Sequence, residues 1–187
     1  MRLLRHTLVM LLTAVLLMAC GGQPATEPLP DTGGAIIAAE SRLLAQGSGQ
    51  IADGEIAPDF SYTLPDGTTV RLSDHQGQPV LLNFWATWCL PCIEEMPAIE
   101  RVYSEAAGAL VVLAVNRNEL PAAIARFAPS VNVSFPLIAD LSGSIGDHYR
   151  VTSLPTTFFI ASDGTIAGRH IGALSEQQLA ERLSSLP

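Results

Sequence analysis

The chain has 187 residues, with 10 basic and 18 acidic side chains and a formal net charge of −8 at pH 7. Every basic residue is an arginine, and no basic patch is present that would favour nucleic acid or anionic lipid headgroups as partners. The length suits one domain with its own hydrophobic core, and no internal repeat is found.

The first twenty residues predict export from the cytoplasm. Two arginines precede an apolar run from Leu8 to Met18, which is shorter than the roughly 20 apolar residues that a membrane-spanning helix needs. Ala19 and Cys20 follow this run and resemble the lipobox of bacterial lipoproteins. We therefore predict that residues 1–19 are a lipoprotein signal peptide and that a lipidated Cys20 anchors the protein to a bacterial membrane. The alternative is a plain signal peptide or an uncleaved anchor, in which Cys20 is incidental.

Residues 20–54 predict a flexible tether. The stretch GGQPATEPLPDTGG is rich in proline, glycine and acidic residues and has too little apolar surface to fold alone. In the stretch AIIAAESRLLAQ, residues 35–46, isoleucines and leucines could share one face, which predicts a short helix that GSGQIADGE then ends.

Removal of residues 1–19 takes away two arginines and no acid, so the net charge changes from −8 to −10.

Residues 55–187 predict one α/β domain, because buried apolar runs alternate with amphipathic segments. Continuous apolar runs indicate strands that are buried on both faces. Pro-Asp-Gly and Asp-Gly steps indicate tight turns. In chain order, the predicted elements are a hairpin around Pro65-Asp66-Gly67, a strand in 79–87, a helix from Cys92 to about Ala107, a strand in 109–118, a helix in 120–129 with Pro121 in its first turn, two strands around Asp163-Gly164, and a helix in 175–186 with Ser175 as its N-cap.

The segments FWATWCLPC and LPTTFFI, together with this order of elements, resemble the thioredoxin-like fold. More specifically, they resemble the exported, membrane-tethered thiol-disulfide oxidoreductases of the TlpA/ResA/DsbE type. The resemblance covers roughly residues 55–187, and its motifs are more specific than a bare C-x-x-C. It implies a central mixed β-sheet with helices on both faces, an N-terminal β-hairpin extension, no cofactor, and reversible dithiol–disulfide exchange with protein substrates.

Cys89 and Cys92 are the candidate redox pair. A sulfur at a helix N-terminus lies near unsatisfied N–H groups, which favour thiolate over thiol, and this position predicts Cys89 as the nucleophile. Cys92 lies one turn further on, which suits the resolving role of releasing a mixed disulfide. A zinc site is disfavoured, because Cys20 and the four histidines supply no paired ligand spacing. A static structural disulfide would gain little from so short a loop.

Pro155 precedes a predicted buried strand in SLPTTFFI. The resemblance implies that it is a cis-proline facing the two cysteines, so we predict a cis Leu154–Pro155 bond that presents nearby backbone to an extended substrate chain. The alternative is a trans proline that merely starts the strand. The predicted substrate groove consists of Trp88, Leu90, Pro91, Leu154 and Thr156.

Glu95 follows Cys92 by three residues and therefore lies on a neighbouring face of the helix. The pattern C-x-x-C-x-x-E-x-P resembles the tethered reductases, in which a partly buried glutamate takes and gives the proton of the resolving cysteine. The alternative, which we adopt for Glu94, is an acid that merely suits the helix dipole. Asn83 stands where cytosolic thioredoxins have a buried acid, and we interpret it as a hydrogen-bonded polar core residue.

The surroundings of the cysteines predict a reductant. Leu90 and Pro91 donate no side-chain hydrogen bond and carry no charge, and Glu94 and Glu95 oppose a thiolate, so the reduced form gains little stability. A reductant outside the cytoplasm implies a membrane electron donor that re-reduces it. Its substrates are predicted to be protein disulfides, with apocytochrome c and metal-centre assembly proteins as candidates. Apocytochrome c reductases of the family often have an acid after the cis-proline, where this chain has Thr156.

Two other classes of function are alternatives to the oxidoreductase. Extracytoplasmic peroxiredoxins share the stretch APDFSYTLPDG, but their peroxidatic cysteine follows a P-x-x-x-T-x-x-C pattern that this chain lacks, because Thr87 lies only two residues before Cys89. A non-catalytic binding module would need neither the cysteine pair nor the proline. Both remain alternatives to the oxidoreductase.

Overall fold

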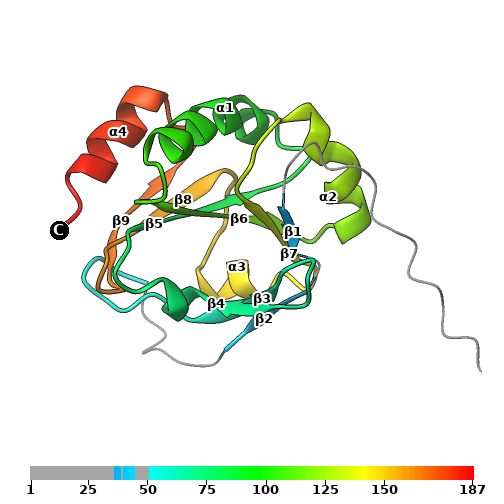
Figure 1. Ribbon diagram of the computed structural model, residues 1–187, viewed down its shortest axis with the longest axis horizontal. Helices are drawn as coiled ribbons and strands as arrows, with labels where there is room; N and C mark the ends of the chain where they lie inside the picture. Colours follow the sequence, from blue (N-terminus) through cyan, green and yellow to red (C-terminus); the bar gives the residue numbers. More distant parts are fainter. Residues whose placement is uncertain (1–35, 39, 45–50) are drawn as a thin grey trace, which may run out of the picture.

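The computed structural model describes residues 36–38, 40–44 and 51–187 of the chain. A six-stranded mixed sheet with the order β1-β7-β6-β5-β8-β9 forms its centre (Figure 1). The four strands from β1 to β5 in this order are parallel, whereas β8 runs antiparallel to both of its neighbours. The strands are β1 Ile36–Ala38, β5 Val80–Trp85, β6 Val111–Arg117, β7 Pro136–Asp140, β8 Thr156–Ile160 and β9 Ile166–Ile171.

Helices cover both faces of this sheet. In Figure 1, α1, α2 and α4 lie above it, and α3 lies below it together with a second sheet of order β2-β3-β4. The helices are α1 Leu90–Glu105, α2 Pro121–Phe127, α3 Ser144–His148 and α4 Glu176–Ser184, with short 3-10 helices at Leu72–His75 and Ala128–Ser130. The second sheet consists of β2 Glu40–Leu43, β3 Phe60–Thr63 and β4 Thr69–Arg71. The predicted fold class is therefore confirmed.

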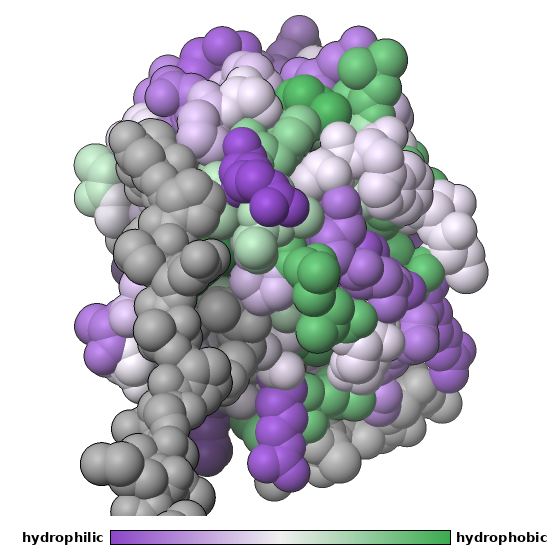
Figure 2. Space-filling model, turned by 90° about the vertical axis from the view of Figure 1, so that its right-hand side faces the viewer, coloured by the Kyte–Doolittle hydropathy of each residue, from purple (hydrophilic) through white to green (hydrophobic). Residues whose placement is uncertain are grey.

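Strand β5 is the clearest case of sequence dictating structure. All six of its side chains are buried, because alternate residues enter two separate hydrophobic cores. Leu81 and Trp85 pack in the core under α1, α2 and α4, while Leu82 and Phe84 pack in the core shared with α3 and the second sheet. On the side of the molecule where α2 lies, hydrophilic and hydrophobic surface is interspersed (Figure 2).

The short helix predicted within residues 35–46 is wrong. This stretch forms β1, which pairs with β7 from Ile36↔Pro136 to Ala38↔Ile138, and β2, which pairs with β3. Ile37 and Ala38 are buried. A twelve-residue helix is marginal by itself, whereas two open sheet edges offer complete backbone pairing and burial, so tertiary context overrides the helical spacing. Strand β1 thus extends the central sheet, and β2 extends the second sheet. Residues 1–35, with the predicted signal peptide and Cys20, lie outside the described residues.

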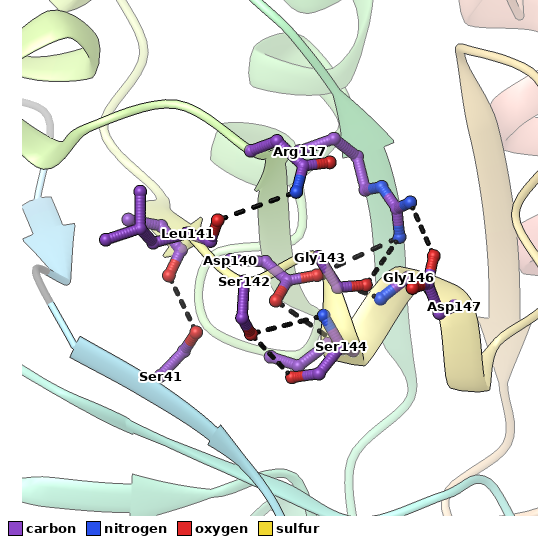
Figure 3. A network of polar contacts seen from close by, with 12 residues as sticks. Ser41, Arg117, Asp140, Leu141, Ser142, Gly143, Ser144, Gly146 and Asp147 are labelled. Atoms are coloured by element: carbon purple, nitrogen blue, oxygen red, sulfur yellow. Dashed lines mark hydrogen bonds and ion pairs between the residues drawn. The ribbon is translucent and has the colours of Figure 1, made fainter.

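Strand β7 and helix α3 were not predicted, and a polar network holds their connection (Figure 3). Asp140 is almost fully buried and accepts hydrogen bonds from the backbone N–H groups of Ile145, at 3.3 Å, and Gly146, at 2.9 Å. Arg117 donates to the carbonyl of Gly143 and to Asp147, both at 2.9 Å. A Cβ atom at Gly146 would lie 1.5 Å from the Arg117 guanidinium, so glycine is required for this approach.

Other local predictions are confirmed. The hairpin turn lies between β3 and β4, Pro121 opens α2, and the Ser175 side chain caps α4 by accepting a hydrogen bond from the N–H of Gln178. Helix α1 begins at Leu90, two residues before the predicted start, with Cys89 as its N-cap. Within the part of the chain that the structure describes, no helix combines the length and apolarity needed to cross a membrane.

Candidate active site

Cys89 and Cys92 form a disulfide at the start of α1. Their Cα atoms are 5.3 Å apart. Strand β5 ends at Trp85, and a tight turn follows in which the N–H of Cys89 donates to the carbonyl of Ala86 at 3.1 Å. Cys89 is 6% exposed and Cys92 is fully buried. An incoming thiol or disulfide therefore reaches Cys89 before Cys92.

The predicted groove residues divide into two sets. Trp88 and Leu90 are 71% and 64% exposed, and Pro91 is also exposed. These three side chains form an apolar rim next to the disulfide in the sequence. Thr156 is only 2% exposed, and its hydroxyl donates to the carbonyl of Ser153 at 2.7 Å. The polar group of Thr156 is therefore used inside the fold, and its place in the groove stays a prediction.

The loop before β8 contains the predicted cis bond between Leu154 and Pro155. Leu154 is partly buried and packs against the hydrophobic core that includes both cysteines. Pro155 is buried, and its carbonyl accepts a hydrogen bond from the N–H of Gly172 at 2.9 Å. The loop that follows β9 therefore fixes the backbone at Pro155.

Glu95 is buried, with 2% of its surface exposed. One carboxylate oxygen, Oε1, accepts a hydrogen bond from Asn83 Nδ2 at 2.7 Å, and the other, Oε2, accepts one from the N–H of Leu174 at 3.0 Å. Burial raises the pKa of Glu95 to about 7, although both hydrogen bonds act in the opposite direction. A carboxyl group with this pKa can gain or lose a proton near neutral pH.

Asn83 is fully buried in β5, as expected for a polar core residue, and it has a partner that the sequence did not reveal. Its Nδ2 atom donates to Glu95 and also to Thr157 Oγ1 at 3.0 Å, which links β5, α1 and β8. Its Oδ1 atom has no hydrogen-bond partner among the described residues. Asn83 therefore orients the carboxyl group of Glu95 without adding a second charge.

Glu119 is a second carboxylate near the redox pair, and sequence reasoning missed it. It lies between β6 and α2 and hydrogen-bonds Thr87, two residues before Cys89. No local pattern could have revealed this contact, because the two residues are 32 positions apart.

For metals, no group of three or more potential ligand side chains is arranged to hold an ion within residues 36–38, 40–44 and 51–187.

A C-x-x-C disulfide at the N-terminus of a helix that follows a buried central strand defines a thioredoxin-like thiol-disulfide oxidoreductase. Glu95 lies in the same helix, and Leu154, which precedes the cis bond, packs against the hydrophobic core that includes both cysteines.

The chain belongs to the AhpC/TSA family, whose pattern matches residues 54–169. It is 39% identical over 136 residues to the thioredoxin-like protein YneN of Bacillus subtilis, which covers 71% of this chain and 79% of YneN. It is 36% identical over 137 residues to the thiol-disulfide oxidoreductase ResA of Geobacillus kaustophilus, covering 73% of this chain and 79% of ResA. The crystal structure of an exposed lipoprotein thioredoxin from Streptococcus pneumoniae matches with a TM-score of 0.62 and 30% identity, over 68% of this chain and 99% of that one.

Proposed function

We propose that this protein is an extracytoplasmic, lipid-tethered reductase of protein disulfides. The observation that carries the proposal is the Cys89–Cys92 disulfide at the start of α1, with the buried Glu95 one turn beyond Cys92. In the reduced enzyme, the Cys89 thiolate attacks one sulfur of a substrate disulfide, forms a mixed disulfide and releases the other substrate sulfur as a thiolate. Cys92 then attacks the sulfur of Cys89, which closes the enzyme disulfide and releases the second substrate thiolate.

Two electrons pass from the enzyme dithiol to the substrate in this cycle. The proton that Cys92 must lose before its attack needs an acceptor, because Cys92 is fully buried and water cannot reach it directly. Glu95 is the candidate acceptor, since its pKa of about 7 lets it take a proton near neutral pH and release it afterwards. The substrate thiolates then take up protons from solvent.

The apolar rim supports a protein substrate. Trp88, Leu90 and Pro91 expose carbon-rich surface beside a nearly buried sulfur, which favours an extended polypeptide over a small hydrophilic thiol. Pro155 has no N–H, so it offers no competing donor where the substrate chain would lie. Leu154, which leads into the cis bond, extends the apolar surface of the core toward this loop.

The direction of exchange follows from the residues around the disulfide. Neither Leu90 nor Pro91 stabilises a Cys89 thiolate, and the acidic side chains of Glu94 and Glu95 oppose one, so the site favours the reductant direction. The oxidised enzyme must then be reduced by a membrane protein that carries electrons across the bilayer.

The candidate substrates are apocytochrome c and proteins that assemble metal centres. Because Thr156 is buried, the position after the cis-proline offers little side-chain surface to either of them.

The membrane tether rests on the predicted lipobox at Cys20. It is supported by the similarity to a Streptococcus pneumoniae protein that is described as an exposed lipoprotein thioredoxin. Labelling of cells with a fatty-acid analogue should modify the wild-type protein but not a Cys20→Ala variant, and unlabelled wild-type protein would contradict the tether.

Trapping of partners tests the catalytic part of the proposal. Cys92→Ser leaves the mixed disulfide unresolved, so we expect it to capture extracytoplasmic proteins that dithiothreitol releases, whereas Cys89→Ser captures none. Reduced wild-type protein should also reduce insulin. Peroxide consumption without insulin reduction would favour the peroxidase alternative, and neither activity would favour a binding module.

A further inference from the structure

Glu119 joins two loops next to the redox pair. Its Oε1 atom accepts a hydrogen bond from the hydroxyl of Thr87 at 2.5 Å, and its Oε2 atom accepts one from the backbone N–H of Thr87 at 2.7 Å. Asn116 Nδ2 donates a third hydrogen bond to Oε2, also at 2.7 Å. Both carboxylate oxygens are therefore engaged with the loop that leads into α1.

The other attachments of this loop are a turn hydrogen bond and the burial of Ala86 and Cys89 in the hydrophobic core. Ala86 is buried, and its carbonyl accepts the turn hydrogen bond from Cys89. Trp88, between Thr87 and Cys89, is 71% exposed, so its side chain is not packed into the core. The contacts between Thr87 and Glu119 therefore add a polar attachment to the segment that places Cys89 at the helix N-terminus.

The carboxylate of Glu119 is itself held in place by Asn116. Asn116 is fully buried in β6, and its Oδ1 atom has no hydrogen-bond partner in the described part of the chain. An unpaired buried polar atom is destabilising, so Asn116 keeps its orientation toward Glu119 although its Oδ1 atom stays unpaired. Within the described residues, Glu119 forms no salt bridge, and the nearby Arg117 is bound to Asp147 and the carbonyl of Gly143.

We propose that Glu119 is a positioning residue for thiol-disulfide exchange. It fixes Thr87 and thereby holds the backbone between β5 and α1 so that the Cys89 sulfur stays at the helix N-terminus in line with an incoming disulfide. This inference rests on the exchange at Cys89 proposed above. Because reacting atoms must be aligned closely, a small displacement of the loop lowers the rate strongly even though Glu119 does not touch the substrate.

Two substitutions of Glu119 separate geometry from charge. Glu119→Ala removes every contact to Thr87. In Glu119→Gln the amide oxygen can still accept from the N–H of Thr87 and from Asn116, and the amide nitrogen can donate to the Thr87 hydroxyl, so the contacts persist without the carboxylate. Thr87→Val removes only the hydrogen bond from the Thr87 hydroxyl to Glu119 and keeps the one from its backbone N–H. Glu105→Ala is the matched control, because Glu105 is an exposed acid at the far end of α1.

The readout is the second-order rate constant with which each reduced variant attacks dithiodipyridine, an uncharged disulfide. This reaction does not depend on the identity of the protein substrate, so it can succeed even if insulin reduction fails and the proposed function is wrong. We expect about a tenfold loss for Glu119→Ala, recovery to within about threefold of wild type for Glu119→Gln, and no change for Glu105→Ala.

Two results for the Glu119 variants would overturn the proposal. One is a rate for Glu119→Ala within twofold of wild type. The other is an equal loss in Glu119→Gln, which would make the charge, rather than the hold on Thr87, responsible. If Glu119→Ala does not fold, Thr87→Val carries the test. We expect its rate to fall by about threefold, as for the loss of one hydrogen bond from the loop, and an unchanged rate contradicts the positioning role.

Discussion

Replacement of Glu95 by glutamine should change the dependence of stability on pH. The pKa of Glu95 is raised from 4.5 to about 7 in the folded protein, mainly because the carboxyl group is buried. A raised pKa means that the folded state binds the proton more tightly than the unfolded state. The contribution of Glu95 to the free energy of unfolding is therefore full below pH 4.5. It is lost as the pH rises through about 7, because Glu95 must then ionise inside the core.

The size of the effect follows from the shift. At 1.36 kcal/mol per pKa unit, ionisation of the buried carboxyl group lowers the free energy of unfolding by about 3 kcal/mol between pH 4 and pH 8. Glutamine cannot ionise, so the variant lacks this loss. It also places one N–H donor against Asn83 or Leu174, which costs about 1–3 kcal/mol at every pH. The informative quantity is therefore the change with pH and not the stability at one pH.

Chemical unfolding of the oxidised proteins at pH 4, 6 and 8 measures this quantity. The free energy of unfolding of Glu95→Gln relative to wild type should rise by about 3 kcal/mol from pH 4 to pH 8. Glu94→Gln is the control, because Glu94 is exposed on the same helix turn. A difference between Glu95→Gln and wild type that stays constant with pH refutes the reasoning, as does one that falls.

Three further predictions concern the site and the fold. In the reduced protein, one equivalent of iodoacetamide should label Cys89 first, because Cys92 is buried, and peptide mapping that finds Cys92 labelled first would reverse the assigned roles. Gly146→Ala should lower the free energy of unfolding by about 1–3 kcal/mol, because the new methyl group displaces the Arg117 guanidinium, and unchanged thermal unfolding would show that Arg117 relocates freely. Ser175→Ala should remove about 1 kcal/mol through loss of the α4 cap, whereas Ser185→Ala, after the helix end, should have little effect.

The sequence predicted those elements whose signal is local. Strand β5 is recognisable because burial on both faces leaves a continuous apolar run, and the hairpin around Gly67 because its turn needs a residue with positive φ. Strand β1 could not be recognised in this way. Its partner β7 lies about a hundred residues further along the chain, and only that open edge makes a strand more stable than the helix which the spacing favours.

The candidate site shows the same division. Cys89, Cys92 and Glu95 lie within seven consecutive residues, so their spacing on one helix could be read directly. The contact between Asn83 and Glu95 depends on how β5 packs against α1, and the contact between Thr87 and Glu119 joins loops from different strands. Such contacts are set by the three-dimensional packing of distant segments, and the local spacing of residues does not contain them.

The reduction potential of the Cys89–Cys92 disulfide tests most directly whether the protein is a reductase. Equilibration against glutathione mixtures, with the disulfide quantified by alkylation, gives the midpoint. We expect a value near that of thioredoxin, about −270 mV, because Leu90 and Pro91 do not stabilise a thiolate and two glutamates oppose it. A midpoint near the −120 mV of DsbA, a difference of about 7 kcal/mol at 1.4 kcal/mol per 30 mV, would make the protein an oxidant and contradict the proposed function.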